Sequence, residues 1–382
     1  MNCTDYNSCC GCRACEQICA VHAISMFADP HGFLYPRIDP ACCVSCGRCR
    51  EVCPVLHSEL CKNDVPQQVF AAYNTDDNVL KGSSSGGVFP ALAHGILEQK
   101  GIVFGASYHG PTCVVHSSAD TLDKCARFST SKYVQSDIGS TYVEARRALE
   151  SGHKVLYSGT PCQIAGLKSF CGREYENLFT CDIVCHGVGS PRHYADYIAM
   201  LEKRHGSRVN AINMKDKRKG WLDSTIRVEL ADGRVLDRAE TQGWKSLFME
   251  GFVLRSSCFD CRFCTAQRVG DVTIGDYWGI RKTHPEFYNP DGVSLLLVNS
   301  EKGEQLLKRI ESRLRLRSSS FDLAAENNPN LRRATAVPPR YDEVSSALRD
   351  QTLENVLRRF FTPPPLHRLW GALKRICRIS KG

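Results

Sequence analysis

Two runs of cysteine with identical spacing near the N-terminus constrain this chain more than any other feature of its sequence. The first run begins at Cys9 and the second at Cys43, and both follow the pattern C-x2-C-x2-C-x3-C. Twelve of the chain's 22 cysteines lie within the first 61 residues. The N-terminus shows neither the basic stretch nor the apolar run of a signal peptide, so we expect a cytoplasmic protein. In a reducing compartment, thiols at short fixed spacings favour metal binding over disulfides.

This spacing is typical of bacterial dicluster ferredoxins, in which three thiolates of one run bind a 4Fe-4S cluster and the fourth crosses to the other cluster. The expected ligands of the first cluster are Cys9, Cys12, Cys15 and Cys53. Those of the second are Cys43, Cys46, Cys49 and Cys19. Zinc sites prefer two C-x2-C pairs, so a triplet followed by a single cysteine favours iron–sulfur clusters. Cys10 and Cys42 are additional neighbours of these ligands.

The pattern of apolar residues divides the chain into three parts. Residues 1–61 form the dicluster ferredoxin-like domain, with a hairpin over 24–38 that covers the clusters. Polar residues 62–68 form a linker. Residues 69–320 form the body, and residues 321–382 a C-terminal extension. In the body we expect strands and helices to alternate, at 69–73, 87–99, 102–108, 140–150, 154–157, 161–170, 178–185 and 191–204. The fold class is therefore α+β overall, with an α/β body built on a mixed sheet.

Charge is concentrated at the C-terminal end of the chain. Lys and Arg exceed Asp and Glu by 49 to 41, but residues 355–382 contain seven basic residues and no acidic ones. The remainder is almost neutral, which argues against nucleic-acid binding. Residues 366–379 have the spacing of a basic amphipathic helix. This helix is expected either at an anionic membrane surface or against a neighbouring domain or subunit.

A third cysteine group, Cys258-x2-Cys261-x2-Cys264, has the triplet of a 4Fe-4S site but no fourth thiolate of its own. Radical-SAM enzymes use C-x3-C-x2-C, so that class does not fit. We expect the fourth ligand to be Cys185, with Cys162 as the second choice. Three thiolates with His186 would also form a tetrahedral zinc site, and this alternative stays open.

Two turns of the body have the residue types of cofactor contacts. Residues 81–87, Lys-Gly-Ser-Ser-Ser-Gly-Gly, precede an apolar helix and could cradle a phosphate, although a plain serine-rich helix cap explains the same residues. Residues 158–163, Ser-Gly-Thr-Pro-Cys-Gln, place Cys162 at a strand–helix turn, where α/β folds hold reactive groups. Cys185 and His186 are adjacent and would face opposite ways on a strand, which disfavours a thiol nucleophile.

Taken together, these motifs resemble the bacterial branch of the coenzyme F-420 hydrogenase/dehydrogenase beta-subunit family. The resemblance covers roughly residues 1–300 and rests on the dicluster run and five further motifs. These lie at 84–89 (SSGGVF), 131–136 (SKYVQS), 158–163 (SGTPCQ), 185–187 (CHG) and 271–279 (DVTIGDYWG).

The resemblance implies a flavoprotein that binds FAD beside a 4Fe-4S cluster. Carried over by position, the flavin contacts are Ser84, Ser85, Gly86, Gly87, Ser131, Lys132, Tyr133, Gln135, Thr160, Cys162 and Gln163. Asp276 is expected near the site, in an unassigned role. The implied reaction passes electrons between ferredoxin-type clusters and a small organic hydride acceptor or donor, which the sequence does not identify.

These expectations describe an oxidoreductase with two ferredoxin-type clusters, a third cluster and FAD. Its expected partner is an electron-carrier protein such as ferredoxin, and an oligomer is compatible with the sequence. The alternative is a non-catalytic electron-relay subunit of a larger redox complex. Flavin content separates the two, because a relay needs no hydride chemistry.

Overall fold

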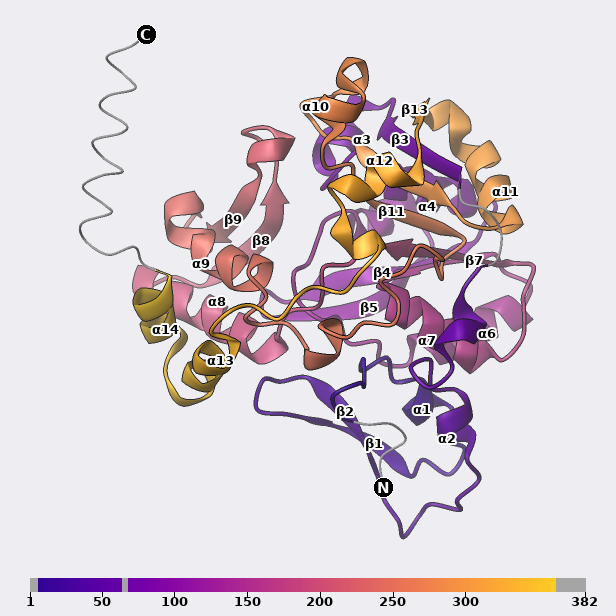
Figure 1. Ribbon diagram of the computed structural model, residues 1–382, viewed down its shortest axis with the longest axis horizontal. Coiled ribbons are helices and arrows are strands. Elements are labelled where there is room, and N and C mark those ends of the chain that lie inside the picture. The colour runs from indigo at the N-terminus through magenta and orange to yellow at the C-terminus, as the bar shows by residue number, and fades with distance from the viewer. Residues whose placement is uncertain (1–5, 64–67, 362–382) are drawn as a thin grey trace.

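An eight-stranded mixed sheet forms the centre of the computed structural model, which describes residues 6–63 and 68–361 (Figure 1). Its strands are β3 (Gln68–Asn74), β4 (Ile102–His109), β5 (Cys113–Ala119), β6 (Val155–Gly159), β7 (Leu178–Ile183), β11 (Val272–Asp276), β12 (Ser294–Val298) and β13 (Leu314–Ser318). Their order across the sheet is β13-β3-β12-β11-β7-β6-β4-β5. Strands β4, β6, β7 and β11 run parallel, and the other pairings are antiparallel. The mixed sheet predicted from the sequence is therefore confirmed.

Helices cover both faces of this sheet because its central strands are apolar on both sides. Along β6, Val155 and Tyr157 face the core shared with α6 (Thr141–Glu150) and α7 (Pro161–Cys171). Leu156, between them, faces the opposite core. That core is shared with α4 (Val88–Leu97) and α11 (Glu301–Ile310). The body elements expected from the sequence are present with small shifts at their ends. The strand expected over 178–185 ends at Ile183, so Cys185 and His186 lie in the following loop.

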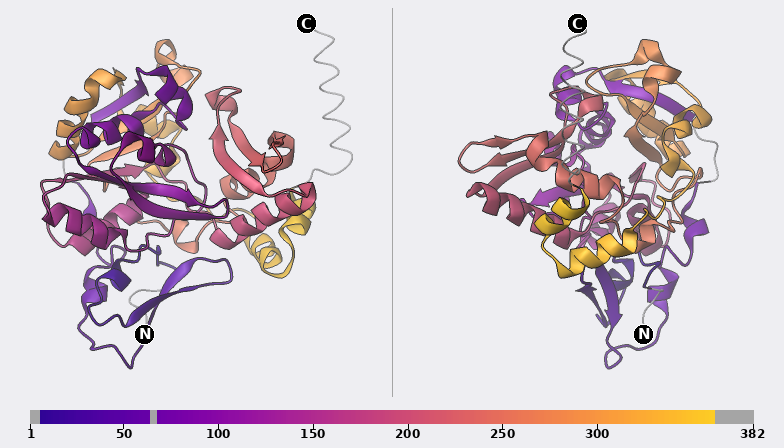
Figure 2. Two further views of the ribbon diagram at one scale, coloured as in Figure 1. Left: turned by 180° about the vertical axis from the view of Figure 1, so that it is seen from behind. Right: turned by 60° about the vertical axis from the view of Figure 1, so that its left-hand side comes forward.

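A second lobe has its own three-stranded antiparallel sheet and its own core. Its strands are β8 (Val209–Asp216), β9 (Thr225–Leu230) and β10 (Val235–Leu236). Around them pack α8 (Pro191–His205), α9 (Arg238–Met249), α13 (Tyr341–Asp350) and α14 (Leu353–Phe360). The views in Figure 2 show α13 and α14 against α8 at the edge of this lobe. The predicted basic helix at 366–379 lies outside the described residues.

The N-terminal module lies beside the body and contacts α7 (Figure 1). It contains α1 (Ala14–Gln17), β1 (Ile24–Ala28), β2 (Leu34–Ile38), α2 (Arg48–Glu51) and the 3-10 helix η1 (Ser58–Cys61). Strands β1 and β2 pair antiparallel, which confirms the predicted hairpin. Cys12 packs directly against Gly166 of α7, where an added Cβ would lie 3.0 Å from the Cys12 sulfur. The module is therefore seated closely on the body.

The other short helices connect these units. They are α3 (Asp77–Gly82), α5 (Leu122–Cys125), α10 (Ile280–Thr283) and α12 (Phe321–Glu326), with 3-10 turns η2 (Ala126–Phe128), η3 (Trp221–Asp223), η4 (Ser256–Cys258), η5 (Pro285–Phe287), η6 (Glu311–Arg313) and η7 (Pro329–Leu331). Among the described helices, none has the length and apolar character needed to cross a membrane.

Gly86 occupies a position with no room for a side chain. An added Cβ would lie 2.5 Å from the Ser294 nitrogen and closer still to the Ala72 carbonyl oxygen. We predict that Gly86→Ala lowers the free energy of unfolding by about 1–3 kcal/mol, because β3 and β12 must separate to admit the methyl group. Gly82→Ala is the matched control, since nothing lies within 4 Å of a Cβ there. Denaturant unfolding of both variants measures the difference, and equal midpoints would contradict the prediction.

Candidate functional site

The carboxyl ends of three parallel strands bring together the chemistry-bearing loops of the body. Strands β6, β7 and β11 are neighbours in the sheet and point the same way. Cys162 follows β6, Cys185 follows β7, and Asp276 is the last residue of β11. In open α/β sheets, ligands bind at this edge. Two of the predicted site cysteines are thereby placed side by side.

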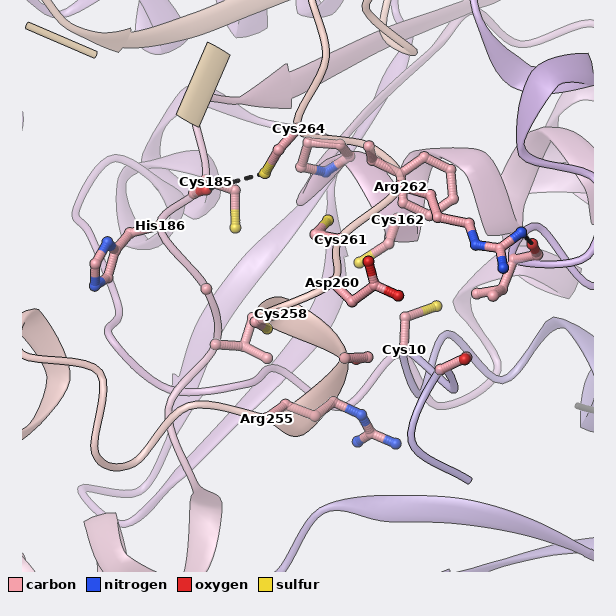
Figure 3. Close-up of a pocket in the computed structure, with 17 residues that line it drawn as sticks. Cys10, Cys162, Cys185, His186, Arg255, Cys258, Asp260, Cys261, Arg262 and Cys264 are labelled. Carbon is pink, nitrogen blue, oxygen red and sulfur yellow. Dashed lines mark hydrogen bonds between the residues drawn. The ribbon is translucent and has the colours of Figure 1, made fainter. Parts of the chain in front are cut away.

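Six cysteines line one cavity at this edge (Figure 3). They are Cys10, Cys162, Cys185, Cys258, Cys261 and Cys264. In Figure 3 the sulfur atoms of Cys185, Cys258, Cys261 and Cys264 surround a common space, with Cys10 and Cys162 on the side of the N-terminal module. Cys264 donates a hydrogen bond of 3.8 Å to the carbonyl oxygen of Cys185. The structure therefore brings the third cysteine triplet to both of its expected fourth partners.

A buried ion pair holds the loop that carries this triplet. Arg268 and Asp182 are 1% and 0% exposed, and their side chains lie 3.2 Å apart. Arg268 also donates to the carbonyl oxygens of Phe263 and Thr265. Breaking a buried pair leaves an uncompensated charge, which costs several kcal/mol. This pair thus fixes the position of Cys264 relative to the end of β7.

The donor set fits an iron–sulfur cubane. Burial raises the pKa of the Cys185 thiol, and raises that of Cys258 to about 12. A hydrogen bond between Cys261 and Cys264 lowers the pKa of Cys261 and raises that of Cys264. Buried thiols of this kind ionise when a metal takes the place of the proton.

A cubane also accounts for the spread of the thiols. Within residues 6–63 and 68–361, no three His, Cys, Asp or Glu side chains converge as they would on a single ion. A cubane distributes its ligands over separate iron corners, so its thiolates need not meet at one point. His186 turns away from the thiols in Figure 3, and its Nε2 lies 3.3 Å from the Phe248 carbonyl oxygen. A zinc site completed by His186 therefore has little geometric support.

A second cavity collects the first cysteine quartet of the N-terminal module. Cys9, Cys12, Cys15 and Cys53, the residues expected to bind one cluster, all line it. Of the other quartet, Cys19 and Cys49 pack beside Cys15 and Ile24. Cys43 is half-buried and Cys46 is exposed. The second expected cluster site therefore lies nearer the surface than the first.

The two cavities share a wall. Cys10 and Val55 line both the cavity of the first quartet and the cavity of the third triplet. The first quartet and the triplet are therefore separated by a single layer of side chains. This short separation is what stepwise electron transfer between clusters requires.

The predicted flavin contacts at 84–87 are tightly integrated into the protein. Ser84 Oγ accepts a 2.7 Å hydrogen bond from the backbone of Ser131, which joins two of the predicted segments. Gly86 N donates to Ser294 Oγ at 2.9 Å, and Ser85 Oγ donates to the Val293 carbonyl oxygen. The expected serine cap is wrong, because Gly87 in the left-handed region, at φ 74°, begins α4 without a side-chain cap.

The predicted contacts further along the chain also have protein partners. Thr160 and Gln163 form a capping box at the start of α7, and Gln163 Nε2 donates to Ser136 Oγ at 3.1 Å. Gln135 Nε2 donates to the Cys10 carbonyl oxygen at 3.0 Å. Tyr133 stacks on Phe248 with ring centroids 4.7 Å apart. The glutamines therefore connect loops to one another, a role that the sequence motif did not indicate.

Lys132 is a partly buried cation without a carboxylate partner among the described residues. Its ammonium donates to the Arg127 carbonyl oxygen at 2.6 Å and lies 5.8 Å from the centre of the Tyr108 ring. Burial lowers the pKa of Lys132 to about 7. A cation in such surroundings gains from a bound anion.

Sequence reasoning missed a group of residues around Asp276. Asp276 pairs with Lys215 of β8 and accepts a 2.8 Å hydrogen bond from Trp221 Nε1. Lys217 donates to three backbone carbonyl oxygens, among them that of Ser85, and burial lowers its pKa to about 8. The run Lys-Asp-Lys-Arg-Lys at 215–219 is the sequence signal that could have drawn attention to this group.

Comparison with known proteins places this arrangement. Residues 152–323 match the family described as the C terminus of the coenzyme F420 hydrogenase/dehydrogenase beta subunit, and residues 8–56 match a 4Fe-4S dicluster domain. The chain belongs to the coenzyme F-420 hydrogenase/dehydrogenase beta-subunit family. Both matches agree with the resemblance found in the sequence. The match to the dicluster domain covers both cysteine runs.

Two proteins that resemble this chain are both named for coenzyme F420. The chain is 26% identical over 316 residues to the coenzyme F420-dependent sulfite reductase of Methanocaldococcus jannaschii, covering 80% of this chain and 46% of that protein. The chain thus spans about half the length of this curated relative. A chain of the F420-reducing [NiFe] hydrogenase complex from Methanosarcina barkeri, in a xenon-derivatised structure, has 17% identity and a TM-score of 0.45, covering 71% of this chain and 90% of that one.

Replacement of single cysteines tests the fourth ligand of the third cluster. We predict that Cys185→Ser lowers the iron content of anaerobically purified protein by about four atoms per chain, the content of one cubane. Cys162→Ser is the matched control and is expected to keep that iron. Iron and acid-labile sulfide analysis measures both. The reverse pattern would transfer the assignment to Cys162.

Proposed function

We propose that this protein is an iron–sulfur flavoenzyme that passes electrons between ferredoxin-type 4Fe-4S clusters and a small organic hydride carrier through FAD. The observation that carries this proposal is the shared wall of the two cysteine-lined cavities. One belongs to the N-terminal module and the other lies at the ligand-binding edge of the sheet. Family membership supports an oxidoreductase, and the flavin is our inference from the family resemblance.

The residues near this edge suit an anionic cofactor. Lys132 and Lys217 are cations whose hydrogen-bond partners are carbonyl oxygens, and the pKa values of both are lowered by burial. Binding a diphosphate would relieve the cost of burying these charges. The segments that contain Ser84 and Ser131 meet here through a backbone hydrogen bond. In our proposal FAD is held between these segments and the end of β11, close to the triplet cavity.

FAD, when bound, would supply the exchange between one-electron and two-electron chemistry that clusters cannot perform. The residues of the chain arrange the groups around it. Cys46 is exposed, so the second quartet is the natural point of contact for a carrier protein such as ferredoxin. The first quartet and the triplet then lie in sequence toward the sheet edge. Asp276, paired with Lys215, is placed to hold a proton at the end of β11.

The identity of the hydride carrier belongs to the proposal as a class. The relative from Methanocaldococcus jannaschii is described as coenzyme F420-dependent. A deazaflavin is accordingly the first carrier to screen, followed by nicotinamides and quinones. Electrons could pass in either direction along the same groups.

Cofactor analysis tests the proposed function directly. We predict that anaerobically purified protein contains about twelve irons per chain, as three cubanes require, and releases FAD on denaturation. Reduced ferredoxin should bleach the flavin absorbance under anaerobic conditions. Iron without flavin would support an electron-relay subunit instead. Stoichiometric zinc without sulfide would contradict both functions.

Lys132 provides a test of the flavin site with a defined pH dependence. We predict that Lys132→Met weakens flavin binding roughly tenfold or more, because a charge-assisted hydrogen bond is lost. The pKa of Lys132 is lowered to about 7, so its ammonium becomes neutral as the pH rises through 7. Flavin affinity of the wild type should therefore be constant below pH 7 and fall above it, and the variant should lack this fall. Flavin fluorescence titration measures both.

The matched control is Lys124→Met, because the Lys124 side chain is exposed and pairs with Asp120 at the surface. Its affinity and pH profile should match those of the wild type. Equal flavin affinity of the Lys132 variant and the wild type at pH 6 would remove Lys132 from the site.

A further inference from the structure

Cys10 and Cys162 come from different parts of the protein and meet between the two cavities. Cys10 belongs to the N-terminal module, and Cys162 lies in the first turn of α7 in the body. Their thiols are hydrogen-bond partners, and both line the triplet cavity (Figure 3). The pair therefore spans the interface between module and body.

Neither thiol is needed for the proposed clusters. Cys10 lies outside the C-x2-C-x2-C-x3-C positions, since the first quartet is complete with Cys9, Cys12, Cys15 and Cys53. Cys162 is left over once Cys185 completes the triplet. This inference thus rests on the ligand assignment of the proposed function. Two adjacent thiols without a ligand role have the composition of a dithiol site.

The backbone holds both cysteines in place. The carbonyl oxygen of Cys10 accepts a 3.0 Å hydrogen bond from Gln135, and that of Cys9 accepts a 2.7 Å bond from buried Arg255. Cys162 lies within the capping box of α7, and its sulfur is 3.2 Å from Thr160 Oγ1. A disulfide requires Cβ atoms within about 4.5 Å and correctly directed bonds, so a pair fixed from both sides loses little entropy on closing.

We propose that Cys10 and Cys162 form a redox-active dithiol, which a peroxide oxidises to a disulfide joining the N-terminal module to the body. In this step the two sulfur atoms form an S–S bond and the O–O bond of hydrogen peroxide breaks. The two thiol protons leave in two molecules of water, so the dithiol loses two electrons and the peroxide gains them. A dithiol reductant reverses the step by thiol–disulfide exchange.

The disulfide would convert a noncovalent contact into a covalent one at the wall between the cavities. The module is otherwise held by polar contacts such as Arg13 with Asp137 and by the packing of Cys12 on Gly166. A cross-link there keeps the module seated while the neighbouring clusters are exposed to oxidant.

Peptide mapping of the holoprotein tests the proposal. Anaerobically purified protein is first assayed for iron and flavin and then treated with a stoichiometric amount of hydrogen peroxide. Free thiols are blocked with iodoacetamide, and the protein is digested without reductant. We expect a linked peptide containing Cys10 and Cys162, which dithiothreitol separates into its two halves. Cys10→Ser and Cys162→Ser should each abolish this peptide while retaining the iron of all three clusters.

Cys42→Ser is the matched control, because Cys42 adjoins the ligand Cys43 as Cys10 adjoins Cys9, yet it is exposed. This variant should give the same linked peptide as the wild type. Separate alkylation of Cys10 and Cys162 after peroxide treatment would overturn the proposal. Loss of one cluster's iron in Cys162→Ser would overturn it too, by making Cys162 a ligand. Because iron and flavin are measured before oxidation, failure of the proposed function is recognised independently.

Discussion

The side chain of Arg255 is the interaction on which the joining of module and body depends. It is fully buried, and it donates to the carbonyl oxygens of Cys9 and Leu34 and to Gln135 Oε1. Its guanidinium lies 4.0 Å from the centre of the Tyr35 ring. Burying a charge is costly unless its donors are satisfied, and here residues of both units satisfy them. The cost is thus offset when module and body are together, which couples their association to the correct position of Cys9 and Cys10.

This coupling explains why the clusters and the sheet edge form one system. Arg255 lies three residues before Cys258, so the residue that docks the module also begins the segment that carries the triplet. Gln135 contacts both Arg255 and Cys10 and lies within a segment that also contains Lys132. Displacement of the module would therefore move the triplet loop and the flavin-site segment together. Electron transfer over a single layer of side chains requires this kind of rigidity.

The second lobe contributes to the site in a different way. Strand β8 ends next to the edge of the main sheet, where Lys215 meets Asp276 and Lys217 meets the loop that contains Ser85. Lys215 also lies 5.1 Å from the centre of the Trp278 ring. Two lysines buried with few carboxylates would destabilise an isolated lobe, so they are better explained by an anionic ligand at this junction.

The sequence by itself determined the features that depend on local spacing. Cysteine intervals of two and three residues allow thiolates within one short loop to reach a common cluster, so the quartets and the hairpin over 24–38 could be predicted without tertiary information. Alternating apolar runs likewise predicted most body elements, because burial of both sheet faces leaves a periodic pattern. Only the tertiary structure decided how distant segments meet. The placement of Cys185 beside the triplet, the position of Arg255 between module and body, the Lys215–Asp276 pair and the Cys10–Cys162 pair depend on strand order and domain docking. These contacts join residues 61 to 246 positions apart in the chain, and no local pattern encodes such separations.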